Sequence, residues 1–138
     1  MFTHHTRHGL LSLVAFIALA VVHTWPLASA PAHWSRVDNA DAALNIWAVN
    51  WVGAHLLQEP SRLFDANIFH PEKLTLAYSE VMIVQGVVAM PIVLLGGPPV
   101  LAFNFALLAG LALSGWAFCL LVRRWTGSWA GMVCRWRG

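Results

Sequence analysis

VLAFNFALLAGLALSGWAFCLLV, residues 100–122, is the stretch that decides the fold class of this chain. It contains 23 residues and no charged side chain, and charge returns at Arg123 and Arg124. About 20 consecutive apolar residues of α-helix cross the hydrocarbon layer of a bilayer. The stretch therefore predicts a transmembrane helix.

Two other apolar stretches flank a long polar loop. The first runs from Leu10 to Leu27, and the second covers residues 81–97 with Pro91 inside it, where a kink is expected. The run Gly96-Gly97-Pro98-Pro99 then breaks the chain before the longest stretch. We expect an all-α, polytopic membrane protein with about three transmembrane helices, at residues 10–27, 81–97 and 100–122.

The composition agrees with a membrane protein. Hydrophobic residues make up 59% of the chain, charged residues 10%, and the mean hydropathy is +0.65, whereas soluble domains carry about 25% charged residues. The net charge of +2 and the lack of a basic stripe argue against a nucleic-acid partner. The two cysteines, Cys119 and Cys134, do not have the spacing of metal ligands, so they imply neither a zinc site nor a disulfide. Membrane lipid is the expected partner, and the inner (cytoplasmic) membrane, crossed several times, is the expected location.

Tryptophan is abundant, with eight residues in 138. Because indole rings favour the headgroup level of a bilayer, those beside the apolar stretches are expected to act as anchors or packing residues. They are Trp25, Trp34, Trp116, Trp125 and Trp129.

The first apolar stretch has features of a secretory signal. It follows Arg7 and precedes Ala28-Ser29-Ala30, which has the small-x-small form of a cleavage site. Pro31 would directly follow the cut, which disfavours cleavage. We favour an uncleaved anchor with residues 1–9 as a cytoplasmic tail.

The loop of residues 28–80 is expected to be extracytoplasmic and holds every carboxylate of the chain. They are Asp38, Asp41, Glu59, Asp65, Glu72 and Glu80. A helix is predicted from Asp38, an N-cap residue, to Leu57, with Asp41 in its first turn. Its spacing predicts an amphipathic helix parallel to the membrane. Residues 60–80 are expected to form short pieces without an independent core.

The charges after the last span conflict with the simplest topology. With Arg7 inside and three spans, Arg123 and Arg124 fall outside, against the positive-inside tendency. The helix at residues 42–57 could cross as a fourth span, or residues 81–97 could be re-entrant. We prefer a third explanation, that helices downstream of this chain set the orientation. Residues 123–138 are then a tail or an aborted fourth span.

Asp38 and Asp41 are the candidate catalytic residues. Their spacing of three places both carboxylates on one helix face. Such a pair can bind a divalent metal ion, Mg²⁺ or Mn²⁺, or one member can deprotonate an acceptor hydroxyl. Helix capping by Asp38 and a favourable dipole interaction of Asp41 explain both residues without any catalytic role, and the spacing alone favours this structural explanation. His70 and Glu80, in the same loop, are candidate substrate-binding residues, and solvation or capping explains each of them too.

The order of these features resembles the N-terminal part of bacterial GT-C-type integral membrane glycosyltransferases and their uncharacterised relatives. The resemblance covers roughly residues 10–130, and its short matching runs are HTWPL (23–27), DNADAALNIW (38–47), LFDANIFHP (63–71) and LAYSE (76–80). It implies an essential acidic residue, Asp38 or Asp41, in the first extracytoplasmic loop. It also implies a polyprenyl-phosphate-linked sugar donor.

Members of that superfamily have many more spans than this chain. The resemblance therefore suggests an N-terminal fragment, inactive without its downstream helices. The main alternative is a small non-enzymatic subunit that packs against a larger complex through the small residues Ala106, Gly110 and Ser114. A secreted protein cleaved after Ala30 and a transporter module with proton-coupling carboxylates also stay open.

Overall fold

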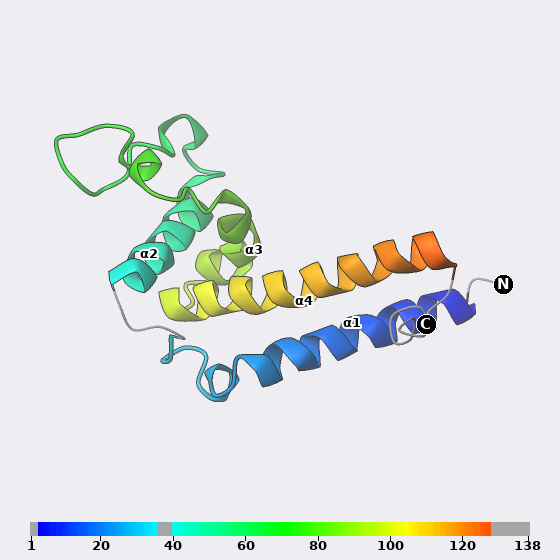
Figure 1. The fold of residues 1–138 in the computed structure, drawn as a ribbon. Helices are drawn as coiled ribbons and strands as arrows, with labels where there is room; N and C mark the ends of the chain where they lie inside the picture. The colour runs from blue at the N-terminus through cyan, green and yellow to red at the C-terminus, as the bar shows by residue number, and fades with distance from the viewer. Residues whose placement is uncertain (1–2, 36–39, 128–138) are drawn as a thin grey trace, which may run out of the picture. The chain divides into compact units, whose positions relative to one another are not determined.

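The computed structural model describes residues 3–35 and 40–127, and every regular element in this part of the chain is a helix. The all-α prediction is therefore confirmed for this part of the chain. The α-helices are α1 (Thr3–His23), α2 (Ala40–His55), α3 (Ile83–Leu94) and α4 (Pro99–Thr126) (Figure 1). Single turns of 3₁₀-helix occur at η1 (Leu27–Ser29), η2 (Pro60–Arg62) and η3 (Thr75–Tyr78).

The chain divides into two compact units. One consists of Met1–His23 with Leu108–Gly138, and the other of Thr24–Leu107. The helix α4 contributes its first residues to the second unit and the remainder to the first. The two chain ends therefore belong to one unit, while the middle of the chain forms the other.

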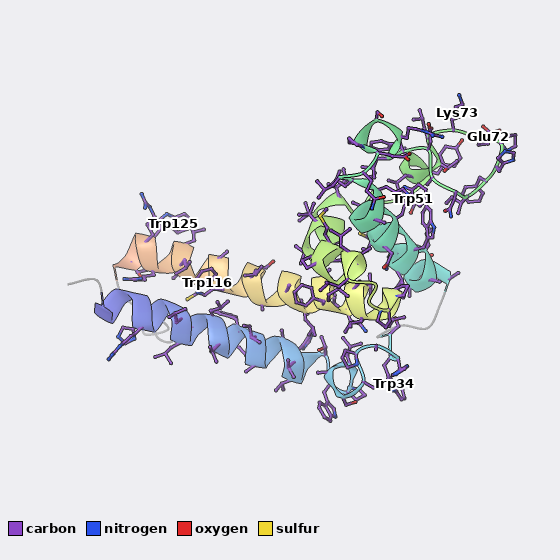
Figure 2. The ribbon with its side chains drawn as sticks, turned by 180° about the vertical axis from the view of Figure 1, so that it is seen from behind. Trp34, Trp51, Glu72, Lys73, Trp116 and Trp125 are labelled. Atoms are coloured by element: carbon purple, nitrogen blue, oxygen red, sulfur yellow. The ribbon has the colours of Figure 1, made fainter. Side chains whose placement is uncertain are left out.

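In the unit of the chain ends, α1 packs against the C-terminal part of α4. Gly115 leaves room for the ring of Phe16, because a Cβ atom there would lie 2.5 Å from Cδ1 of Phe16. The indole nitrogen of Trp116 donates a hydrogen bond of 3.0 Å to the carbonyl oxygen of Gly9 (Figure 2). This pair of helices is held by close approach at a glycine and one tryptophan.

The core of the middle unit is built around α2. On one side Ala48 and Val52 pack with Leu63, Ala66 and Leu76; on another Val49 packs with Ala89, Ala102 and Ala106. Val49 and Val52 have 0% exposure. The helix α2 thus buries apolar residues on two sides, unlike the one-sided amphipathic interface helix that the sequence predicts.

Two glycines let α2 and α3 approach closely. A Cβ atom on Gly86 would lie 2.6 Å from Cβ of Val52, and one on Gly53 would lie 3.0 Å from Cγ2 of Val93. Such distances are below ordinary van der Waals contact between carbon atoms. The crossing therefore requires a glycine at position 86, whereas a methyl group on residue 53 would make a tight contact with the side chain of Val93.

Residues 60–80 join the core of α2. Leu63 and Leu76 are 3% and 2% exposed, and they belong to the same cluster as Val52. The indole nitrogen of Trp51 donates to the carbonyl oxygen of Leu63 at 2.8 Å, and the hydroxyl of Thr75 donates to that of Ala66 at 3.0 Å. The segment therefore consists of short pieces whose buried residues share the core of α2, which agrees with the expectation that it has no independent core.

The helix boundaries differ from those read from apolar runs. The first helix ends at His23, and Leu27 is buried in the following turn, so the predicted span of residues 10–27 is interrupted. The helix α3 covers Ile83–Leu94, with Pro91 inside it, and is shorter than the predicted span 81–97. The helix α4 extends past the predicted 100–122 at both ends. Its first residue is Pro99, which is favoured there because its missing N–H needs no helical partner.

In the described part of the chain, one helix is long and apolar enough to cross a membrane, and it is α4. Only 17% of its most apolar 18-residue window is buried, unlike a core helix of a soluble protein. The apolar helical stretches Arg7–His23 of α1 and Ile83–Leu94 of α3 are each shorter than 18 residues. Trp25, Trp34 and Trp125 expose 68%, 58% and 75% of their surface, while Trp129 lies outside the described residues.

Candidate functional site

Asp41 lies in the first turn of α2, as predicted. The residue is exposed, and the unpaired N–H groups at a helix N-terminus favour a negative charge there. Asp38, the other predicted catalytic residue and metal ligand, lies outside the described residues. A solvent-facing carboxylate at Asp41 can accept a proton from a hydroxyl or bind a cation.

The helix that carries Asp41 is held firmly within its unit. Val49 and Val52 anchor it in two clusters. The amide of Asn50 donates to the carbonyl oxygens of Ile46 at 2.8 Å and Pro99 at 3.1 Å, which ties α2 to the beginning of α4. These contacts restrict how far the first turn of α2 can move.

His70 and Glu80, the predicted substrate-binding residues, lie in the segment that follows α2. Both are exposed, with His70 in a turn that contains a cis peptide bond to Pro71, and Glu80 between η3 and α3. Asp41 is at the opposite end of α2 from the start of this segment (Figure 1). No hydrogen bond or ion pair joins Asp41, His70 and Glu80 within the described residues. Their shared role stays a prediction.

The metal site also stays a prediction. Among the described residues, no group of three or more His, Cys, Asp or Glu side chains is placed to hold a metal ion. Asp41 is the one predicted ligand that lies within this part of the chain.

An aromatic row runs along α2. The rings of Trp47 and Trp51 have centroids 6.0 Å apart, and those of Trp51 and His55 are stacked at 3.7 Å with an angle of 18°. Nδ1 of His55 lies 2.9 Å from the carbonyl oxygen of Trp51. Because a carbonyl oxygen only accepts, Nδ1 carries the proton and a neutral ring keeps the lone pair on Nε2. The sequence signal for this row was the recurrence of aromatic rings every four residues.

The row continues toward the polar segment. The indole nitrogen of Trp47 donates to Oδ1 of Asn67 at 3.2 Å, and Phe69 stacks on Tyr78 at 6.0 Å. Figure 2 shows Trp51 on α2, with Glu72 and Lys73 at the outer end of the segment. The tryptophans therefore attach the segment to α2, while its charged tip points away from the helix.

Asn104 is a buried polar residue whose role the apolar pattern of residues 100–122 does not predict. Its side chain has 0% exposure, and its amide nitrogen donates to the carbonyl oxygens of Pro31 and Trp34, each at 2.7 Å. The available signal was a lone amide side chain inside an otherwise apolar run, which is costly unless hydrogen-bonded.

Comparison of the chain with protein-family models, with curated proteins and with solved structures gave no match in any of the three searches.

Proposed function

We propose that this chain is a glycosyltransferase-like protein of the GT-C type, located in the bacterial inner membrane. Asp41, together with Asp38, supplies the acidic function in transfer of a sugar from a polyprenyl-phosphate-linked donor on the extracytoplasmic side. In this proposal α1 and α3 enter the membrane beside α4, and His70 and Glu80 contact substrate.

The observation that carries the proposal is an exposed carboxylate fixed on a packed helix. Asp41 is exposed at the first turn of α2, and α2 is anchored by Val49 and Val52, which are fully buried. A general base is effective when it is held within reach of the hydroxyl that it deprotonates. The long, largely exposed apolar helix α4 supports a location of the chain at a bilayer, where a lipid-linked donor would be found.

A divalent cation fits the donor set. Mg²⁺ is commonly held by one or two carboxylates together with substrate phosphate oxygens and water. Asp41 and Asp38 would hold Mg²⁺ or Mn²⁺, which would offset the charge of the departing lipid phosphate. The role of the chain itself is then to orient the ion and the acceptor hydroxyl.

The test uses Asp41→Asn and Asp38→Asn introduced at the gene's own locus, so that any longer product stays intact. Membranes from these cells are supplied with a panel of radiolabelled polyprenyl-phosphate hexoses and pentoses, and transfer to endogenous acceptors is measured. We expect at least one of the two variants to lose transfer, and EDTA to reduce it in the wild type.

Glu59→Gln is the matched control, because Glu59 is also an exposed carboxylate in the same unit, 3.9 Å from Arg62. It should keep wild-type transfer. Wild-type transfer in both Asp variants, at unchanged protein levels in the membrane, would rule out the proposed role of the acidic pair.

A second candidate function is a non-enzymatic subunit of a larger membrane complex, with the missing partner docked on α4. Of the small residues named for this role, Ala106 is already packed in the core of the middle unit. Gly110 has no heavy atom within 4 Å of a Cβ placed on it, and Ser114 is exposed. Small exposed residues four apart favour close approach of another helix.

Gly110→Leu tests this alternative. It should abolish co-purification of a partner, while Asp38→Asn and Asp41→Asn should leave it intact. Phe105→Leu is the control, because Phe105 is exposed but lies roughly 140° around α4 from Gly110. Retention of the partner by Gly110→Leu would exclude this surface.

A further inference from the structure

Asn104 is buried in the first turns of α4, and its amide binds the irregular chain around Pro31 and Trp34. Pro31 and Trp34 are 73 and 70 residues away in sequence, and each accepts a hydrogen bond from Nδ2 of Asn104. Both carbonyl groups belong to irregular chain, which has no helical ladder to satisfy them. The asparagine therefore supplies donors that an apolar side chain in this helix would lack.

The orientation of the amide follows from its neighbours. With Nδ2 facing the two carbonyl oxygens, both contacts are favourable at 2.7 Å. The flipped amide would point Oδ1 at the same two oxygens, and three acceptors would face one another. Within the described residues Oδ1 has no hydrogen-bond partner although it is buried. The two donated bonds therefore decide the orientation, at the cost of an unpaired acceptor.

A second asparagine side chain also donates a hydrogen bond that joins the start of α4 to another part of the chain. Asn50 of α2 donates to the carbonyl oxygen of Pro99, 49 residues away and the first residue of α4. Asn50 and Asn104 thus join two parts of the middle unit to residues 99–104: the chain at Trp34, and the helix that carries Asp41.

We propose that Asn50 and Asn104 are positioning residues that together hold Trp34 and α2 on the first turns of α4, and so fix where Asp41 is presented. The pair is called here the amide clamp. Its consequence for sugar transfer rests on the proposed function, whereas its effect on the position of the chain does not.

Distances between spin labels test the amide clamp directly. Labels are attached to cysteines at His33 and Phe105 in one sample, and at Ala43 and Phe105 in a second, after Cys119 and Cys134 are replaced by alanine. All three labelled positions are exposed. The full chain is reconstituted in lipid bilayers, and the distance distribution of each pair is measured by pulsed electron paramagnetic resonance.

The two substitutions should act on different pairs. Asn104→Leu removes both donors at similar volume and should abolish the narrow peak of the 33–105 pair. Asn50→Ala should broaden the 43–105 pair, and the double variant should broaden both. Asn67→Ala is the matched control, since Asn67 makes its hydrogen bond to Trp47 and none to α4; both distributions should stay as in the wild type.

A third pair, at Ala43 and Gln85, reports whether α2 and α3 still pack. If this pair broadens in Asn104→Leu, Asn104→Thr replaces it, because a threonine hydroxyl can donate to one of the two carbonyls; a partial broadening of the 33–105 pair is then expected. Narrow 33–105 and 43–105 distributions in folded variants would overturn the amide clamp.

The transfer assay separates this inference from the proposed function. With the clamp correct, folded clamp variants should show reduced transfer together with altered distances, while Asp41→Asn should leave the distances unchanged. Normal transfer in Asp41→Asn would remove the proposed function and leave the distance result to decide the clamp by itself.

Discussion

Gly86 of α3 lies so close to Val52 of α2 that a Cβ atom on the glycine would be 2.6 Å from Cβ of the valine. The backbone nitrogen of Gly53 would lie 3.3 Å from the Cβ atom added to Gly86. Neither neighbour can move aside easily, because the side chain of Val52 is fully buried and the nitrogen of Gly53 belongs to the backbone. The contact therefore fixes the distance between the two helices that form much of the middle unit.

Gly86→Ala should destabilise this unit by about 1–3 kcal/mol, because an added methyl group in a packed core forces the helices apart. Thermal unfolding in detergent, followed by circular dichroism, measures the loss. Gly110→Ala is the control: nothing lies within 4 Å of its Cβ position, and alanine is the better helix former by about 1 kcal/mol. Equal stability of the two variants would contradict this interpretation of the crossing.

Gly115→Ala should cost less than Gly86→Ala, although its Cβ would also lie 2.5 Å from a side-chain atom of Phe16. Phe16 is only partly buried, so its ring can turn aside. Combining Gly115→Ala with Phe16→Leu should restore part of the loss, since the smaller side chain removes the overlap. Double-mutant analysis of unfolding measures this coupling; additive effects would show that the two residues do not meet.

Trp51→Phe should loosen residues 60–80 without unfolding α2. It removes the hydrogen bond to Leu63 while keeping an aromatic ring beside His55, and one such bond contributes about 1 kcal/mol. Hydrogen exchange of amides in this segment, Leu76 among them, should become faster. Trp125→Phe is the control, because Trp125 is 75% exposed. Unchanged exchange in Trp51→Phe would show that other contacts hold the segment.

Leu74→Asn should stabilise the protein by a few tenths to about 1 kcal/mol. Leu74 has a φ of 57° and is 58% exposed, and a left-handed conformation costs a leucine roughly 1–2 kcal/mol. Asparagine tolerates this region better, and the hydrogen bond from the Leu74 N–H to Asp65 is retained. Leu57→Asn is the matched control, because Leu57 is a similarly exposed leucine without positive φ. If Leu57→Asn raised the unfolding temperature as much as Leu74→Asn, relief of backbone strain at Leu74 would not be the cause.

Hydrophobic runs predicted the helical class and the approximate location of the apolar helices, because helix formation depends on local composition. Local capping and dipole preferences likewise placed Asp41 in the first turn of α2. The hydrophobic runs placed the C-terminal ends of the first and second spans too late, since hydropathy does not register where a chain turns: Leu27 is apolar and buried, yet lies beyond the end of α1.

Contacts between distant residues could not be predicted in this way. Nothing near Asn104 in the sequence indicates that it binds Pro31, and nothing near Gly86 identifies Val52 as its neighbour. The packing of residues 60–80 on α2 likewise depends on tryptophan hydrogen bonds across the unit. The spacing of Asp38 and Asp41 remains the basis for the candidate site.

The pairing of α1 with the distal part of α4 has a consequence for biosynthesis. Trp116 reaches Gly9 across 107 residues of sequence, so the first helix leaves the ribosome long before its partner exists. Residues 24–107 are contiguous and can assemble as soon as they are translated, because nearby segments close at a smaller entropic cost than distant ones. Nascent chains that end at Leu107 and are arrested through a linker long enough to clear the ribosome should therefore already protect residues 40–94 from protease, while α1 remains without its native neighbour.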